Sequence, residues 1–207
     1  MLIFDLDGTL IDSNGVWVEV DKTFLSRRNI PYSKEYHDLV AHTILPICAV
    51  RTKEHFQLEE SCEEIIDEWM TLAAGQYHNI PLKSNVREYL DRCKDAEHRM
   101  TIFTASVPEH CMAAIEHHGL SDYFEQIIFA QELGMDKKSP AIFHKVAEML
   151  HVKPEQCVLF DDSLSACKAA KAAGMTVVGV HDSYFQDSEP DMRELCDQYI
   201  MGFGELL

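Results

Sequence analysis

Apolar residues follow two different patterns in the two parts of this chain. From Asp12 to Asn79 they recur at helical spacing, with almost no strand signal. The last helix of this region shows a stripe of five apolar positions: Ile65, Ile66, Trp69, Met70 and Ala73. From Met100 onward, short apolar runs alternate with helical stretches. The change of period predicts that a helical region and an α/β region share the chain.

The α/β region predicts a parallel sheet. Its expected strands are Met1 to Phe4, Met100 to Phe103, Gln126 to Ala130, Cys157 to Phe160 and Thr176 to Val180. Helical stretches separate the later strands, which is typical of a doubly wound sheet. The predicted fold class is therefore α/β: a Rossmann-like, doubly wound parallel sheet core with a small all-helical insert after the first strand.

Domain boundaries follow from the same pattern. We expect residues 1–12 and 81–207 to form the α/β core and residues 13–80 to form the helical insert. The tail from Asp182 ends in Gly202-Phe203-Gly204, but no strand-to-helix context supports phosphate binding there. We interpret this tail as the end of the chain.

The acidic composition limits the choice of partners. Asp and Glu number 35 against 18 Lys and Arg, and the net charge of -17 opposes non-specific attraction to nucleic acid or anionic membranes. No run of about 18 apolar residues is present, and the first residues lack the basic flank of a signal peptide. The seven cysteines never form a C-x-x-C pair, which favours reduced thiols over disulfides or a zinc site. We expect a cytoplasmic protein without nucleic-acid or membrane partners, a monomer with a homodimer as the alternative.

Candidate functional residues follow the ends of four apolar runs. They are Asp5 and Asp7 after the first run, Thr104 and Ala105 after the second, Lys137 after the third, and Asp161 and Asp162 after the fourth. Ligands of open α/β sheets bind beyond the carboxyl ends of the strands. We therefore expect all four groups to meet in one crevice.

The carboxylates predict a cation site. Asp5 and Asp7 are two residues apart, so in an extended backbone both point to one side and repel each other unless a cation or a proton intervenes. Asp161 and Asp162 add further negative charge. Hard oxygen ligands of this kind suit Mg²⁺ better than zinc or copper. A bound magnesium ion is therefore expected.

A phosphoryl group fits the remaining residues. Lys137 supplies a positive charge, and Thr104 supplies a hydroxyl beside free backbone N–H groups, including that of Ala105, just before a helix expected from Val107. Asp5 can then attack phosphorus in line and form an aspartyl-phosphate that water cleaves. Asp7 can protonate the leaving oxygen and later deprotonate the water. Taken singly, each residue also has an ordinary structural explanation, and Lys138 is an alternative to Lys137.

The motif D-L-D-G-T, followed by Thr104, Lys137 and Asp161-Asp162, resembles the haloacid dehalogenase superfamily of hydrolases. The helical insert resembles the small helical cap of that superfamily. The segment from Lys137 to Phe143, with a proline three residues after the lysine, resembles the group that contains beta-phosphoglucomutase and phosphoglycolate phosphatase.

This resemblance implies a magnesium-dependent phosphatase that hydrolyses a small phosphorylated metabolite. The implied nucleophile is Asp5, and Asp7 is the implied general acid and base. The implied phosphate ligands are Thr104 and Lys137. The implied Mg²⁺ ligands are Asp5, the Asp7 carbonyl, Asp161 and Asp162.

Three alternatives remain. A phosphomutase is disfavoured because the cap histidine and the G-V-x-R segment of the mutases are absent. Dehalogenases and phosphonatases replace the second motif carboxylate, whereas this chain keeps Asp7. A catalytically silent binding module would be marked by loss of a motif carboxylate, and none is lost. In the cap, the candidates to face the substrate are Trp17, His42, Arg51 and Lys53.

Overall fold

The computed structural model describes residues 1–40, 44–77 and 80–207. The strands are β1 (Leu2–Phe4), β2 (Met100–Thr104), β3 (Gln126–Phe129), β4 (Val158–Asp161), β5 (Thr176–Val180) and β6 (Gln198–Ile200). The α-helices are α1 (Asn14–Ser26), α2 (Lys34–Val40), α3 (Leu45–Phe56), α4 (Cys62–Tyr77), α5 (Val86–Asp95), α6 (Pro108–His117), α7 (Pro140–Met149), α8 (Leu164–Ala172) and α9 (Glu189–Leu195). Short 3-10 helices η1 (Leu120–Tyr123), η2 (Pro154–Gln156), η3 (Ser183–Ser188) and η4 (Phe203–Leu206) lie between them.

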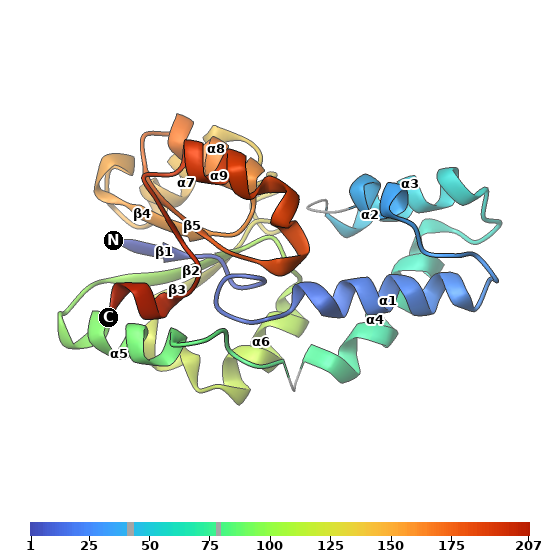
Figure 1. Cartoon of the computed structure of the whole chain (residues 1–207), viewed down its shortest axis with the longest axis horizontal. Helices are drawn as coiled ribbons and strands as arrows, with labels where there is room; N and C mark the ends of the chain where they lie inside the picture. The colour runs from blue at the N-terminus through green and yellow to red at the C-terminus, as the bar shows by residue number, and fades with distance from the viewer. Residues whose placement is uncertain (41–43, 78–79) are drawn as a thin grey trace.

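The strands of the described chain form one sheet in the order β3-β2-β1-β4-β5-β6, and every neighbouring pair is parallel. Figure 1 shows α5 and α6 on one side of this sheet and α7, α8 and α9 on the other. Strand order reverses beside β1, which lies between β2 and β4. The predicted doubly wound α/β fold with a helical insert after β1 is confirmed.

Alternating side chains of the central strands fill the two layers of the core. Ile3 packs in the cluster that contains residues of α7 and α8, whereas Phe4 packs in the opposite cluster with residues of α5 and α6. The Phe4 ring stacks on Phe160 of β4, with ring centroids 4.6 Å apart. Burial of a large apolar side chain stabilises a fold by about 1.5–3 kcal/mol. Both faces of β1 are thus fixed by packing, which holds the strand end where Asp5 follows.

Helices α1–α4, which we call the cap, lie between β1 and β2 in the chain and extend to one side of the sheet (Figure 1). The cap has its own packing: the Phe24 and Trp69 rings are 5.4 Å apart, joining α1 to α4. The Arg28 guanidinium covers the Phe24 ring at 3.6 Å and forms an ion pair with Glu68 at 2.7 Å. The boundaries at residues 13 and 80 stay a prediction. Within the described stretches, no helix has the length and apolar character needed to cross a membrane.

The tail from Asp182 onward contains more structure than the sequence pattern indicated. It adds α9 and an edge strand, β6, which pairs with β5 in the register Val178↔Gln198 and Val180↔Ile200. β6 is three residues long, and only Ile200 is fully buried. With Gln198 exposed and Tyr199 half-buried, β6 lacks the continuous apolar run from which the equally short β1 could be predicted.

Candidate active site

The ends of β1 and β4 bring two carboxylates together around one lysine. The Asp5 backbone N–H donates to the Phe160 carbonyl at 2.9 Å, which places Asp5 beside Asp161. The buried Lys137 ammonium donates to Asp5 Oδ1 at 2.8 Å, to Asp161 Oδ2 at 2.7 Å and to the Phe103 carbonyl at 3.1 Å. Three groups expected from separate strand ends thus meet within hydrogen-bond distance.

Burial and charge act against each other in this cluster. Burial raises the pKa of Asp5 to about 7, although Lys137 lowers it, and Asp161 raises it further. Burial alone would lower the pKa of Lys137, but Asp161 and Asp5 raise that pKa above its usual range. The lysine therefore stays charged and holds both carboxylates by charge-assisted hydrogen bonds.

The donor set fits a divalent cation. Oxygens of Asp5, Asp161 and Asp162 lie within 4.8 Å of one another, and all three residues are buried. Burial, with repulsion from Asp161 and Asp5, raises the pKa of Asp162 well above its usual range. One lysine cannot neutralise three carboxylates, and hard oxygen donors suit Mg²⁺. A cation at this position would remove the excess negative charge.

The turn after β1 and the first residue of α1 donate hydrogen bonds to Asp162. Asn14 Nδ2 donates to Asp162 Oδ2 at 2.8 Å, and the Thr9 hydroxyl donates to Oδ1 at 3.4 Å. Gly8 makes this contact possible, because its φ is +74° and a side chain there would overlap both the Asn14 amide and the Asp162 carboxylate. Lys83 donates to the Gly8 carbonyl at 2.6 Å and fixes the turn from the other side.

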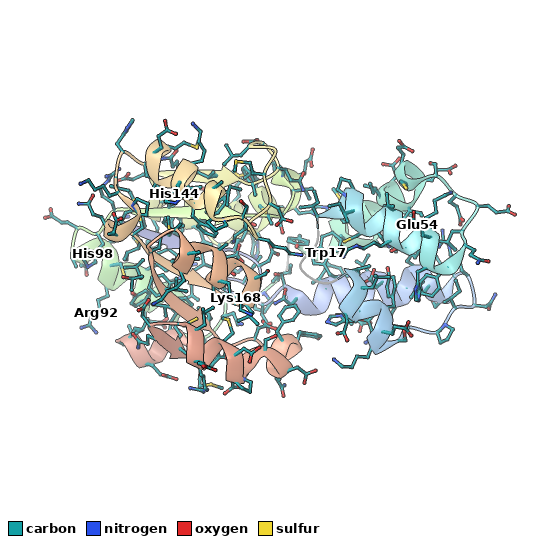
Figure 2. All side chains as sticks on the ribbon, turned by 90° about the horizontal axis from the view of Figure 1, so that it is seen from above. Trp17, Glu54, Arg92, His98, His144 and Lys168 are labelled. Atoms are coloured by element: carbon teal, nitrogen blue, oxygen red, sulfur yellow. The ribbon has the colours of Figure 1, made fainter. Side chains whose placement is uncertain are left out.

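Asp7 is held apart from the three clustered carboxylates. The Tyr77 hydroxyl donates to Asp7 Oδ1 at 2.7 Å, and the Ser106 hydroxyl donates to Oδ2 at 2.6 Å. Trp17 Nε1 in turn donates to the Tyr77 oxygen at 2.7 Å. Burial and the nearby Asp7 raise the pKa of Tyr77 well above its usual range, so the tyrosine remains a donor. Figure 2 shows Trp17 where the cap meets the α/β core. The carboxylate is therefore oriented by one donor from the cap and one from the core.

Thr104 and Ala105 lie at the end of β2, as expected. The Thr104 side chain is buried, and its hydroxyl oxygen accepts the Ser106 N–H at 3.1 Å. This bond shapes the loop that leads into α6, whose first residue is Pro108. Backbone donors at the start of this loop, together with Lys137, are the groups that could hold phosphate oxygens.

One cavity of about 230 Å³ joins these residues to the cap. Its lining includes all seven candidates: Asp5, Asp7, Thr104, Ala105, Lys137, Asp161 and Asp162. The alternative lysine, Lys138, also lines it, but this side chain is exposed. All the expected residues thus border a single space, while their roles remain to be proposed.

The four cap candidates lie in different places. Trp17 lines the cavity. Arg51 and Lys53 are outside its lining: Arg51 donates to the Leu39 carbonyl at 2.7 Å, and Lys53 donates to backbone carbonyls that precede α4. His42 lies outside the described residues.

Sequence reasoning gave no role to Asn14, Tyr77 and Ser106. Ser106 was within reach, because it follows Thr104 and Ala105 at a strand end. Asn14 is 148 residues from its partner Asp162, and Tyr77 is 70 residues from Asp7, so neither has a spacing that could indicate the contact. Only the packing of the cap against the core brings Tyr77 to Asp7.

Most of the chain matches one known protein family. The sequence profile of the haloacid dehalogenase-like hydrolases aligns with residues 2–180. The chain is a haloacid dehalogenase-like hydrolase. The resemblance inferred from D-L-D-G-T is thereby confirmed.

Relatives of this haloacid dehalogenase-like hydrolase include named phosphatases. A phosphorylated carbohydrates phosphatase of Thermotoga maritima is 26% identical over 178 residues, covering 84% of this chain and 81% of the relative. A phosphoglycolate phosphatase of Colwellia psychrerythraea is 27% identical and covers 100% of this chain and 95% of the relative. The prediction of a hydrolase of the phosphatase class is confirmed.

Solved structures share the fold. A haloacid dehalogenase hydrolase of family IA, variant 3, from Entamoeba histolytica has a TM-score of 0.84 at 24% identity and covers 100% of this chain and 94% of its own. At that identity the likeness supports the architecture alone. The shared architecture includes the helical insert after the first strand.

Proposed function

We propose that this haloacid dehalogenase-like hydrolase is a Mg²⁺-dependent phosphatase that cleaves a small phosphomonoester through an aspartyl-phosphate on Asp5. The observation that carries the proposal is the convergence of Asp5, Asp7, Thr104 and Lys137 on one cavity, where Asp5 clusters with two further carboxylates. Several relatives are named for phosphorylated sugars, sugar alcohols or phosphoglycolate, which supports a small metabolite as substrate. The seven cysteines are spread along the chain without a C-x-x-C pair, which agrees with our proposal of a cytoplasmic enzyme, which we take to be a monomer.

In the proposed reaction, Lys137 and the backbone at Thr104 and Ala105 bind the phosphoryl oxygens and orient phosphorus toward Asp5. The Asp5 carboxylate forms the new O–P bond while the bond to the leaving oxygen breaks. Asp7 gives its proton to that oxygen and then takes one from the water that cleaves the aspartyl-phosphate. A magnesium ion held by Asp5, Asp161, Asp162 and the Asp7 carbonyl would neutralise charge on the phosphate oxygens.

The test is phosphate release from p-nitrophenyl phosphate and a panel of phosphorylated metabolites, with MgCl₂ or with EDTA. Native enzyme should turn over only with Mg²⁺, and Asp5→Asn should lower kcat at least about 10³-fold. Asp12→Asn is a matched control, because Asp12 is exposed on the same segment and should leave kcat unchanged. Acid-quenched native enzyme should carry one additional phosphoryl group by mass spectrometry, and the Asp5→Asn variant should not.

Turnover that persists in EDTA would refute the metal requirement. Equal activity of Asp5→Asn and the native enzyme would refute the nucleophile. Transfer of phosphate between two positions of a sugar, without release, would instead identify a mutase.

A further inference from the structure

Two helices of the cap supply a hydrogen-bonded pair that ends on Asp7. Trp17 lies near the start of α1, and Tyr77 is the last residue of α4. Trp17 Nε1 donates to the Tyr77 hydroxyl oxygen at 2.7 Å, and the same hydroxyl donates to Asp7 Oδ1 at 2.7 Å. Figure 2 shows Trp17 where the cap meets the core. A carboxylate of the core is therefore held, on one of its oxygens, by a pair of residues that belongs to the cap.

The chemistry of the two donors fixes the direction of these hydrogen bonds. An indole N–H can only donate, and a tyrosine hydroxyl carries one hydrogen and can also accept. Because Trp17 uses an acceptor site of the Tyr77 oxygen, the single hydrogen of Tyr77 is directed to Asp7. Hydrogen bonds in a chain polarise one another, so the first bond strengthens the second. Trp17 therefore acts on Asp7 through Tyr77.

Tyr77 lies behind the cavity and is fixed there by ring packing. Its side chain is 1% exposed, and the described lining of the cavity includes Asp7 and Trp17 but not Tyr77. The His110 ring of α6 stacks on the Tyr77 ring with centroids 4.8 Å apart, and the Trp17 ring meets Tyr77 edge-on at 6.1 Å. A substrate in the cavity can thus contact Asp7 directly, whereas any effect of Tyr77 on the reaction passes through Asp7.

The hydrogen bonds orient Asp7 without using all of its acceptor sites. Tyr77 donates to Oδ1, and the Ser106 hydroxyl donates to Oδ2 at 2.6 Å. A carboxylate has about four acceptor sites, so two donors leave room for a proton. In the proposed reaction the bond between phosphorus and the leaving oxygen breaks, that oxygen takes the proton from Asp7, and Asp7 becomes a carboxylate. This transfer requires Asp7 to point at the leaving oxygen within hydrogen-bond distance.

We propose that Tyr77 and Trp17 are positioning residues for the general acid: they tie the orientation of Asp7 to the cap, so that proton transfer to the leaving alcohol depends on the contact between cap and core. This inference rests on the proposed phosphatase function. Its consequence is selective. Loss of the pair should slow the hydrolysis of esters whose leaving group needs a proton and spare esters whose leaving group does not.

The experiment measures kcat/KM in MgCl₂ for p-nitrophenyl, phenyl and benzyl phosphate, whose aromatic leaving groups are similar in size and increase in basicity in that order. Because kcat/KM covers the steps up to transfer of the phosphoryl group to Asp5, it reports the acid role of Asp7 alone. Tyr77→Phe should lower kcat/KM about 10- to 100-fold for benzyl phosphate and less than about 3-fold for p-nitrophenyl phosphate. Trp17→Phe should lower the ratio of these two values about 2- to 10-fold, because it removes a bond between neutral groups.

The water step provides a second readout. Asp7 takes a proton from the water that cleaves the aspartyl-phosphate, and this step is the same for every ester. With p-nitrophenyl phosphate, Tyr77→Phe should lower kcat and KM together while kcat/KM stays nearly constant, because the aspartyl-phosphate accumulates. Mass spectrometry of enzyme quenched with acid during turnover should show a larger phosphorylated fraction for Tyr77→Phe than for native enzyme.

Tyr123→Phe is the matched control: it removes a hydroxyl that donates to the Asp91 carboxylate outside the cavity, so both readouts should keep their native values. Thermal unfolding checks folding, and Trp17→Phe decides the matter if Tyr77→Phe does not fold. Variants that slow all three esters equally, or none of them, would overturn the positioning role alone. If Asp7→Asn also slows all three esters equally, the acid role of Asp7 is wrong. No magnesium-dependent turnover of any ester would overturn the phosphatase proposal itself.

Discussion

Lys137→Met removes a positive charge that two buried carboxylates share. Methionine keeps the length and apolar stem of lysine, so the variant chiefly deletes the ammonium and its bonds of 2.8 Å to Asp5 and 2.7 Å to Asp161. Breaking a buried ion pair by removing one partner costs about 3–5 kcal/mol, because the remaining charge is left uncompensated. We expect a loss of that size in the free energy of unfolding when no divalent cation is present.

Magnesium should restore part of this loss. Without the ammonium, Asp5, Asp161 and Asp162 present a more negative site, and a bound cation takes over the missing compensation. A ligand that binds only the folded state stabilises it by about 2.7 kcal/mol at 100 times its Kd. The deficit of Lys137→Met should therefore be at least about 1 kcal/mol smaller in MgCl₂ than in EDTA, because the variant binds the cation more tightly.

Urea unfolding followed by tryptophan fluorescence measures both values. Lys138→Met is the control, because Lys138 is an exposed neighbour and should change stability by no more than about 0.5 kcal/mol. If Lys137→Met is as stable as native enzyme in EDTA, the buried pair does not contribute as argued. A deficit of the same size in EDTA and in MgCl₂ would refute the shared site for lysine and metal.

Three further substitutions test other parts of the structure. Burial in the lining of the cavity raises the pKa of Asp21 from 3.8 to about 7, so the folded state binds an additional proton between about pH 4 and pH 7, and the free energy of unfolding falls as pH rises through that window. Asp21→Asn should remove this fall in the free energy of unfolding. Native and variant curves of urea unfolding against pH that run parallel would contradict it. Tyr77→Phe removes a buried donor to Asp7 and should lower the free energy of unfolding by about 1.5–3 kcal/mol. It should also lower kcat. If urea unfolding and steady-state turnover are both unchanged, the hydrogen bond from Tyr77 to Asp7 does not contribute as argued. Gly8→Ala forces a side chain against Asp162 at positive φ and should weaken Mg²⁺ binding, measured as a smaller rise in Tm with MgCl₂; an undiminished rise would argue against this turn as support for the site.

The strand-end residues could be predicted because their position depends on local pattern. Asp5 and Thr104 each end or directly follow an apolar run, and parallel strands deliver their carboxyl ends to one edge of the sheet. The sequence alone does not separate Lys137 from Lys138, which stands beside it with the same chemistry. Burial decides between them: Lys137 is 7% exposed and bonded to two carboxylates, whereas Lys138 is exposed.

The cap residues could not be predicted, because their contacts depend on how helices dock. Tyr77 reaches Asp7 only because α4 returns to the core 70 residues later. Asp21 shows no sign in the sequence that distinguishes it from solvent-exposed Glu19 two residues earlier. Helical periodicity identifies the apolar face of α1, but it does not indicate which polar residue borders a cavity.

The position of β1 has a consequence for the order in which the chain can fold. β1 is made before its two partners in the sheet, which begin at Met100 and Val158. Contacts this distant in sequence close long loops and form slowly, whereas the helices of the cap make contacts nearer in sequence and can associate earlier. Asp5 therefore leaves the ribosome before any other residue of the site, and it reaches its place only when β4 arrives.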